Sequence, residues 1–172
     1  MEEILIAVAL IIVVALLFWL DKKAERGTPE AGSMYKEILQ TFERVWWCMS
    51  SGELKEIFPN KQFSDREESD GLAGIGYTDQ IEGHETFVNF YFLKVDKEGL
   101  VGIYFRILHI PADRSNFLFS KLCEKYGFPL NHDSAEGKFV LWDLENSVLT
   151  FEVSDDQELQ IRFWDKAFYN KK

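Results

Sequence analysis

Apolar residues occur along this chain in three patterns: one unbroken run near the start, two stripes with helical spacing, and a series of short strand-like segments. The unbroken run extends from Ile4 to Leu20 and contains no charged residue, no polar residue and no helix breaker. A helix of about 17 residues is roughly 25 Å long, slightly less than a hydrocarbon core of about 30 Å. The remaining length is covered by Trp19, which can lie in the interface, and by Lys22 and Lys23, whose long side chains can extend to it. Because no side of this helix is polar and the chain is small, we interpret residues 1–20 as a transmembrane anchor and not as a core helix.

A cleaved signal peptide is the main alternative for this segment. Such a peptide has a basic start, a shorter apolar run and a small-x-small cleavage site. Here the start carries two glutamates, and the run ends in the bulky residues 18–20. These features favour an uncleaved single-pass anchor. The flanking basic residues Lys22, Lys23 and Arg26 all follow the run, so the positive-inside rule predicts that the rest of the chain is cytoplasmic and the short N-terminus is outside.

Residues 21–33 are interpreted as a linker, charged at first and then rich in small residues. The first helical stripe predicts a helix over Met34–Met49, with Ser33 as its N-cap. Trp47 does not fit the apolar side of this helix, because at 100° per residue it projects within the polar side. It is therefore a candidate contact for a partner protein or for the lipid interface. The alternative is that another segment, such as the turn around residues 54–58, covers it.

Residues 34–172 are predicted to form one α+β domain. A second helical stripe over Arg114–Tyr126 ends at Gly127 as a C-terminal cap and Pro129 as a breaker. The predicted strands are Leu72–Tyr77, Phe87–Val95, Leu100–Ile110, Lys138–Leu144, Val148–Ser154 and Glu158–Asp165. The order α-β-β-β-α-β-β-β looks like a duplicated unit. Antiparallel strands with both helices gathered on one face make a two-layer α+β sandwich.

The last predicted strand, Glu158–Asp165, alternates cleanly between apolar and polar positions. Its apolar positions 159, 161 and 163 are expected to face the core, because side chains on a strand point alternately to the two sides of the sheet. Arg162 and Trp164 then project side by side from the polar face. Tryptophan and arginine are enriched at protein interfaces, so Trp164, like Trp47, is a candidate contact for a partner protein.

The net charge disfavours two classes of partner. The chain has 19 Lys and Arg against 29 Asp and Glu, which gives a net charge of −10. Residues 1–33 carry three of the basic and five of the acidic residues, so the domain itself has a net charge near −8. This charge disfavours non-specific binding to nucleic acid and adhesion of the domain to an anionic lipid surface. The predicted partners are the membrane, through the anchor, and another protein.

No pattern in the chain matches a catalytic or cofactor-binding motif. His84, His109 and His132 lie far apart in the sequence and lack metal-ligand spacing. Cys48 and Cys123 belong to no Cys-x-x-Cys pair and are interpreted as ordinary half-buried thiols. A disulfide between them is the alternative if the domain lies in an oxidising compartment. We therefore predict no cofactor and no metal.

These observations favour a membrane-anchored protein-interaction module, with Trp47, Arg162 and Trp164 as its candidate interaction surface. The first alternative is a small accessory subunit of a larger membrane complex, held through its transmembrane helix. A hydrolase that uses Cys123 or a pair of carboxylates is the least favoured possibility, because no base, oxyanion loop or cofactor cradle can be named.

The predicted topology is tested by adding protease to intact spheroplasts and to lysed ones. We expect the domain to be protected until lysis, and its mass to include residues 1–20, because the anchor is uncleaved and the domain is cytoplasmic. Removal of the domain from intact spheroplasts would contradict the predicted orientation and place the domain outside the membrane.

Overall fold

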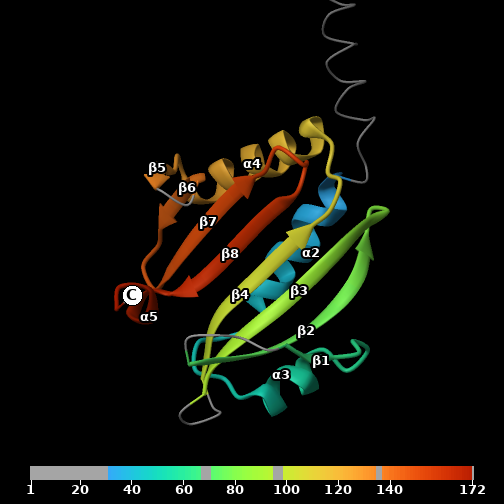
Figure 1. Ribbon diagram of the computed structural model, residues 1–172, viewed down its shortest axis with the longest axis vertical. Coiled ribbons are helices and arrows are strands. Elements are labelled where there is room, and N and C mark those ends of the chain that lie inside the picture. Colours follow the sequence, from blue (N-terminus) through green and yellow to red (C-terminus); the bar gives the residue numbers. More distant parts are fainter. Residues whose placement is uncertain (1–30, 67–70, 95–98, 135–136, 172) are drawn as a thin grey trace, which may run out of the picture.

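The computed structural model describes residues 31–66, 71–94, 99–134 and 137–171, apart from the side chains of residue 31 and residues 131–138. These residues form an α+β fold built on one antiparallel sheet of eight strands (Figure 1). The predicted anchor, residues 1–20, and most of the predicted linker lie outside the described residues. Within the described ranges, no helix is long and apolar enough to cross a membrane.

Two meanders of four strands make up the sheet. The strands are β1 (Ser64–Arg66), β2 (Leu72–Ile81), β3 (His84–Leu93), β4 (Leu100–Ile107), β5 (Leu130–Ser134), β6 (Gly137–Asp143), β7 (Ser147–Val153) and β8 (Leu159–Asp165). Their spatial order is β1-β2-β3-β4-β8-β7-β6-β5, and all neighbouring pairs are antiparallel. The meanders β1–β4 and β5–β8 therefore meet where β4 pairs with β8.

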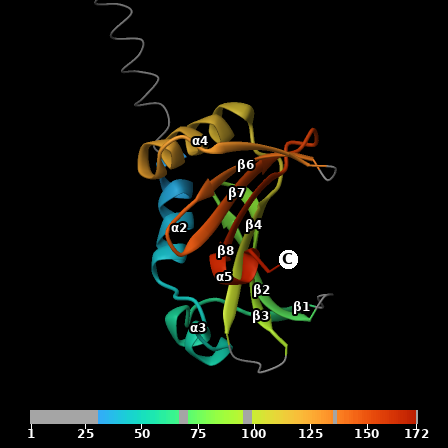
Figure 2. The same ribbon diagram turned by 90° about the vertical axis from the view of Figure 1, so that its left-hand side faces the viewer.

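Most of the helical residues cover one face of this sheet. The helices are α2 (Ala31–Glu43), α3 (Ser51–Ile57), α4 (Ala112–Tyr126) and α5 (Lys166–Tyr169). Figure 1 shows α2, α3 and α4 behind the sheet, and Figure 2 shows them to the left of it. The short α5 packs on the other side, where Phe168 contacts Trp164. Helix α2 precedes the first meander and α4 precedes the second, so a helix followed by a four-stranded meander occurs twice along the chain.

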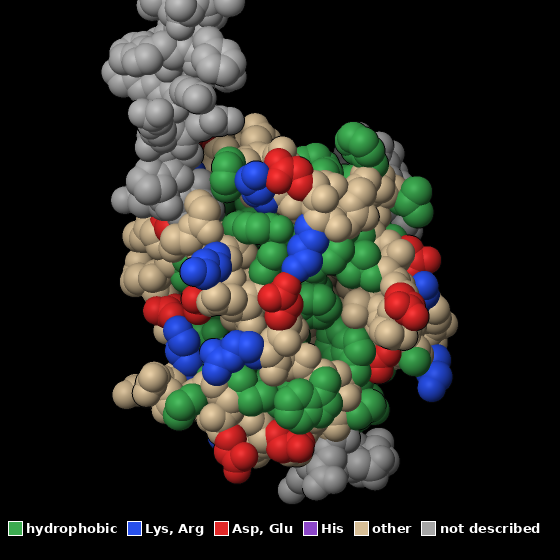
Figure 3. Space-filling view, turned by 180° about the vertical axis from the view of Figure 1, so that it is seen from behind, with side chains coloured by type: hydrophobic (Ala, Val, Ile, Leu, Met, Phe, Trp, Pro, Cys, Tyr) green, Lys and Arg blue, Asp and Glu red, His purple; other side chains and the backbone are tan. Residues whose placement is uncertain are grey.

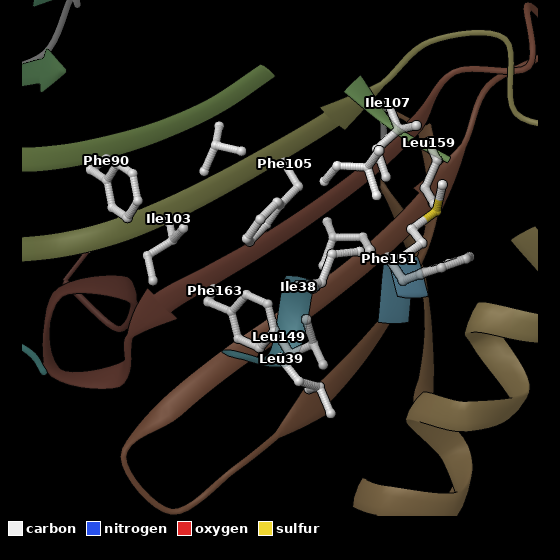
Figure 4. Packing of buried hydrophobic residues seen from close by; sticks show 14 of the residues in the cluster. Ile38, Leu39, Phe90, Ile103, Phe105, Ile107, Leu149, Phe151, Leu159 and Phe163 are labelled. Carbon is white, nitrogen blue, oxygen red and sulfur yellow. The ribbon is translucent and has the colours of Figure 1, made fainter. Parts of the chain in front are cut away.

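The core lies between the sheet and these helices, and Figure 4 shows its packing. Alternate residues of the central strands point into it, among them Phe90, Phe105 and Phe163, which are fully buried. Phe42 of α2 stacks on Phe163 of β8 with ring centroids 4.0 Å apart. Phe105 of β4 meets the same ring edge-on at 6.5 Å. Phe163 therefore joins α2 to both meanders, and burial of such rings is a large source of stability.

The predicted α+β class and antiparallel sheet are confirmed, but the predicted order of three strands in each half is wrong. Each half contains a fourth strand, β1 or β5, at an edge of the sheet. Their sequences, Ser-Asp-Arg and Leu-Asn-His-Asp-Ser, show no apolar alternation, because an edge strand pairs on one side only and buries little. The two predicted helices, α2 and α4, lie on one face as expected, and the short α5 on the opposite face was not predicted.

The predicted helix over Met34–Met49 is also wrong in extent, because α2 begins at Ala31 and ends at Glu43. Cys48 has a φ of 67°, a left-handed conformation that interrupts an α-helix. The Cys48 N–H donates to the carbonyl of Leu100, and the Leu100 N–H donates back to Met49. Pairing with the start of β4 thus replaces helical bonding, while Met49 stays buried as the helical stripe required.

Helix α3 follows at once and was not predicted. It starts with a capping box, in which the Ser50 hydroxyl accepts from the Glu53 N–H and the Glu53 carboxylate accepts from the Ser50 N–H. This pattern of serine followed three residues later by glutamate is a recognised sign of a helix start. The helix is only seven residues long and contains Gly52, so its apolar periodicity is too weak to predict it.

Replacing Phe163 with alanine tests the central place of this ring. We expect Phe163→Ala to lower the free energy of unfolding by about 3–5 kcal/mol, because it leaves a cavity between α2 and the sheet. The measurement is urea denaturation followed by circular dichroism. Phe128→Ala is the matched control: Phe128 is 94% exposed, so its loss should change stability by less than about 0.5 kcal/mol. Equal effects of the two substitutions would contradict the described packing.

Candidate interaction surface

The face of the sheet turned away from α2, α3 and α4 carries the candidate site. We call it the open face, and it is turned toward the reader in Figure 1. Its side chains are the alternate residues of the central strands that do not enter the core: Phe87, Asn89, Tyr91, Tyr104, Arg106, Thr150, Glu152, Gln160, Arg162 and Trp164. Their pairing across the strands places aromatic and charged groups next to one another.

Trp164 lies between two other aromatic rings on the open face. It stacks on Tyr91 with centroids 5.6 Å apart and planes 12° apart, and on Phe168 of α5 with centroids 5.9 Å apart. Tyr91 belongs to β3 and Trp164 to β8, with β4 between these strands. Gly102 of β4 pairs with both residues. A Cβ atom on Gly102 would lie 2.3 Å from Trp164 Cζ3, so the rings meet across β4 only because residue 102 has no side chain.

Arg162 belongs to a chain of hydrogen bonds that crosses three strands. Its guanidinium donates to Glu152 Oε2 at 3.3 Å and to the amide oxygen of Gln160. Gln160 donates to Glu158, which also accepts from Arg106 at 2.7 Å. The hydrogen bond from Arg106, with that from Gln160, holds the pKa of the Glu158 carboxyl below its usual range. Two arginines and two glutamates balance in charge, so this network orders the surface without giving it a strong net charge.

Tyr104 occupies the middle of the open face. It pairs with Arg162 on one side and with Asn89 on the other, and the Arg162 guanidinium lies 5.3 Å from its ring centroid. Desolvation raises the pKa of the Tyr104 hydroxyl. Among the described residues, Asn89 Oδ1 and Thr150 Oγ1 are buried without a hydrogen-bond partner. They lie on either side of the Tyr104–Arg162 pair, and each costs desolvation energy that no hydrogen bond among the described residues offsets.

Trp47 lies on the opposite side of the sheet from Arg162 and Trp164. Because α2 ends at Glu43, Trp47 does not project from the polar side of a helix, and that prediction is wrong. Its ring is half-buried, and the centroids of the Trp47 and Phe42 rings are 6.2 Å apart. The indole N–H donates to Ser147 Oγ at 3.1 Å. The alternative that another part of the chain covers it is therefore supported, with Phe42 and Ser147 in contact with the ring. Residues 54–57, which were expected to form a turn, belong to helix α3. The structure thus brings Arg162 and Trp164 together and leaves Trp47 apart.

Trp46 takes the exposed position that the sequence assigned to Trp47. The helical spacing placed Trp46 on the apolar side, but it is 52% exposed. Figure 3 views the helix-covered side of the molecule and shows hydrophobic side chains in a band among charged ones. The change of conformation after Glu43 shifts the spacing and exchanges the roles of the two tryptophans.

Among the described residues, the groups considered for catalysis are not assembled into a site. Cys48 and Cys123 are both free thiols; Cys123 is half-buried as expected, whereas Cys48 is exposed. Burial raises the pKa of the Cys123 thiol. A raised pKa lowers the fraction of reactive thiolate at neutral pH. His84 is the first residue of β3, His109 lies two residues after the end of β4, and the His132 side chain is outside the described set. In the described part of the chain, no three His, Cys, Asp or Glu side chains lie close enough to hold a metal ion.

Several residues of the open face were not singled out from the sequence. Phe87, Tyr91 and Tyr104 come from β3 and β4, whose sequences carry apolar residues on both sides of the strand. Each of these strands has a neighbour on both sides in the sheet. The sequence signal that could have identified these residues was the apolar second side of both strands. That side supplies the aromatic residues of the open face. The stack of Tyr91 on Trp164 depends on the pairing of β4 with β8, which no local pattern reveals.

Comparisons with protein families, with curated proteins and with solved structures find no match. The site must therefore be interpreted from its own geometry.

Gly102→Ala tests the contact between Gly102 and Trp164. The added methyl group overlaps the indole, so we expect a loss of about 1–3 kcal/mol in the free energy of unfolding. Gly52→Ala in the exposed helix α3 is the matched control, since its Cβ would meet no atom closer than Ser50 Oγ at 3.8 Å. That variant should be neutral or slightly stabilising. In a Trp164→Leu background the cost of Gly102→Ala should fall, and an unchanged cost would show that the indole is not the group that excludes the methyl.

Proposed function

We propose that this chain is a membrane-anchored protein-interaction module whose open face binds another protein. Residues 1–20 serve as the anchor in this proposal, and the domain lies on the cytoplasmic side. The support for the anchor is the unbroken apolar run and the basic residues that follow it.

The observation that carries the proposal is the composition of the open face. An antiparallel sheet with one face toward solvent normally presents polar residues there. Here Phe87, Tyr104 and Trp164 are only half-buried, and Arg162 lies among them. Aromatic residues and arginine are the types most enriched in the energetic centres of protein interfaces.

The open face is also held in a fixed arrangement before any partner binds. The Trp164 ring stacks between the rings of Tyr91 and Phe168. The Arg162 guanidinium is held by its hydrogen bonds to Glu152 and Gln160. Side chains that are already ordered lose little entropy on binding, so each contact contributes more to affinity. The balanced charges of the network suit a partner surface of mixed polar and apolar character, which is typical of proteins.

The other functions have less support. The accessory-subunit alternative assigns the contact with the partner to residues 1–20, whereas the open face supplies a candidate contact within the described residues. The hydrolase alternative is disfavoured by the raised pKa of Cys123 and by its packing against the core. The interaction module is the function that the described geometry supports best.

The proposed surface is tested by photo-crosslinking in living cells. The photoreactive residue p-benzoylphenylalanine replaces Phe87 on the open face or, as the control, Lys55 on the exposed side of α3. We expect a protein adduct from position 87 and none from position 55. Adding Arg162→Ala should lower the adduct at position 87 about tenfold, because loss of an interface hot spot costs more than about 1 kcal/mol.

The control for folding is the thermal midpoint of each variant, which should stay within a few degrees of the parent chain. Equal adducts at positions 87 and 55, or an adduct at 87 that Arg162→Ala leaves unchanged, would contradict the assignment of the open face.

A further inference from the structure

The turn between α4 and β5 exposes two large apolar side chains. Phe128 is 94% exposed and Leu130 is 65% exposed, which makes them the most exposed large apolar residues in the described chain. Pro129 lies between them. Adjacent exposed apolar residues on a small domain indicate a contact surface, since single scattered ones are the norm.

This turn is rigidly built, so the exposure of Phe128 is a fixed property of the fold. The Gly127 N–H caps α4 by donating to the Cys123 carbonyl at 2.9 Å. The Gly127 carbonyl in turn accepts from the indole N–H of Trp142 at 2.8 Å, and Trp142 is buried. These two bonds fix the backbone immediately before Phe128, and Pro129 restricts the backbone immediately after it.

The turn lies at the end of the molecule where α2 begins. Figure 1 shows α4 and β5 at the same end as the start of α2, and Figure 2 shows α4 at that end in a second view. The start of α2 is held there because the Met34 N–H donates to Glu82 Oε1 of the β2–β3 turn at 2.6 Å. Two other exposed apolar residues lie at the opposite ends of these elements: Trp46 comes three residues after the end of α2, and Leu93 is the last residue of β3.

The length of chain before α2 keeps this end near the anchor. Only residues 21–30 separate the apolar run from Ala31. A chain of that length reaches about 35 Å when fully extended and spans about 18 Å on average when flexible. If residues 1–20 cross the bilayer, the end of the domain that carries the α4–β5 turn faces the lipid surface.

Of the turns at this end of the molecule, the α4–β5 turn has the charge better suited to contact with a lipid surface. The β7–β8 turn contains Asp155 and Asp156, which are exposed. In contrast, the nearby basic residues of α4 are neutralised, Lys121 by Glu124 and Lys125 by Glu43. An anionic surface repels the acidic turn, whereas the α4–β5 turn meets the surface with apolar side chains and little net charge.

We propose that the α4–β5 turn is a second membrane contact, in which Phe128 and Leu130 insert into the interfacial layer of the bilayer that holds residues 1–20. This inference rests on the anchor of the proposed function. Insertion of two apolar side chains is weak on its own, but the anchor makes it an intramolecular event with a high effective concentration. The contact fixes the domain on the membrane with its strands rising from the surface, so that the open face is turned sideways. A partner on that face is then another protein at the same membrane.

The test uses the full-length chain in phosphatidylcholine vesicles. One variant carries p-benzoylphenylalanine in place of Phe128, and the matched control carries it in place of the exposed aromatic Trp46. Flotation of each vesicle sample is measured first, and then lipid adducts formed on illumination are quantified by mass spectrometry. We expect both variants to float and the lipid adduct at position 128 to exceed that at position 46 at least fivefold. The difference should persist at high salt, because the contact is apolar.

The outcomes separate this inference from the anchor itself. If the chain floats but positions 128 and 46 give equal lipid adducts, the second contact is wrong and the anchor stands. If the chain does not float, the anchor and the proposed function fail together with the inference. If position 128 reacts in native membranes with a protein and not with lipid, the turn contacts a protein and the lipid contact is overturned.

Discussion

The antiparallel pairing of β4 with β8 is the interaction on which the rest of this structure depends. It is the one place where the two meanders join, and it brings Ile103 opposite Phe163 on the core side. On the other side it brings Tyr104 opposite Arg162 and Gly102 opposite Trp164. A slip of one residue would exchange the two sides of β8 and bury the charges of the open face. The core and the candidate surface are therefore set by the same register.

Much of the fold follows from local sequence patterns. The unbroken alternation in β8, the apolar central strands and the stop at Gly127 are all visible in the amino-acid sequence, and each is found close to its predicted position. The elements that escaped prediction are those with little burial or little length. β1 and β5 are polar edge strands, and α3 shows only its capping box.

The candidate surface was predictable only in part, for a different reason. Arg162 and Trp164 follow from alternation along one strand, which is local information. Tyr91 and Gly102 join them through pairing between strands, which alternation cannot supply. The position of Trp47 was predicted wrongly because the helical spacing was continued too far along the chain. The residues next to Trp47 are not helical, since Cys48 pairs with the start of β4. Local patterns indicate which side of an element a residue takes, but not which element it meets.

The position of the β4–β8 pair also has a consequence for how the chain folds as it is made. All other strand pairs join neighbours in the sequence, whereas α4 and three strands separate β4 from β8. Closing a long loop costs more entropy than closing a hairpin, so the local meanders should form before this pair does. During synthesis the first meander is complete while β8 is still missing. Until β8 is synthesised, the apolar edge of β4 can pair with any other strand. The chain is therefore most prone to mispairing in the time between completion of the first meander and synthesis of β8.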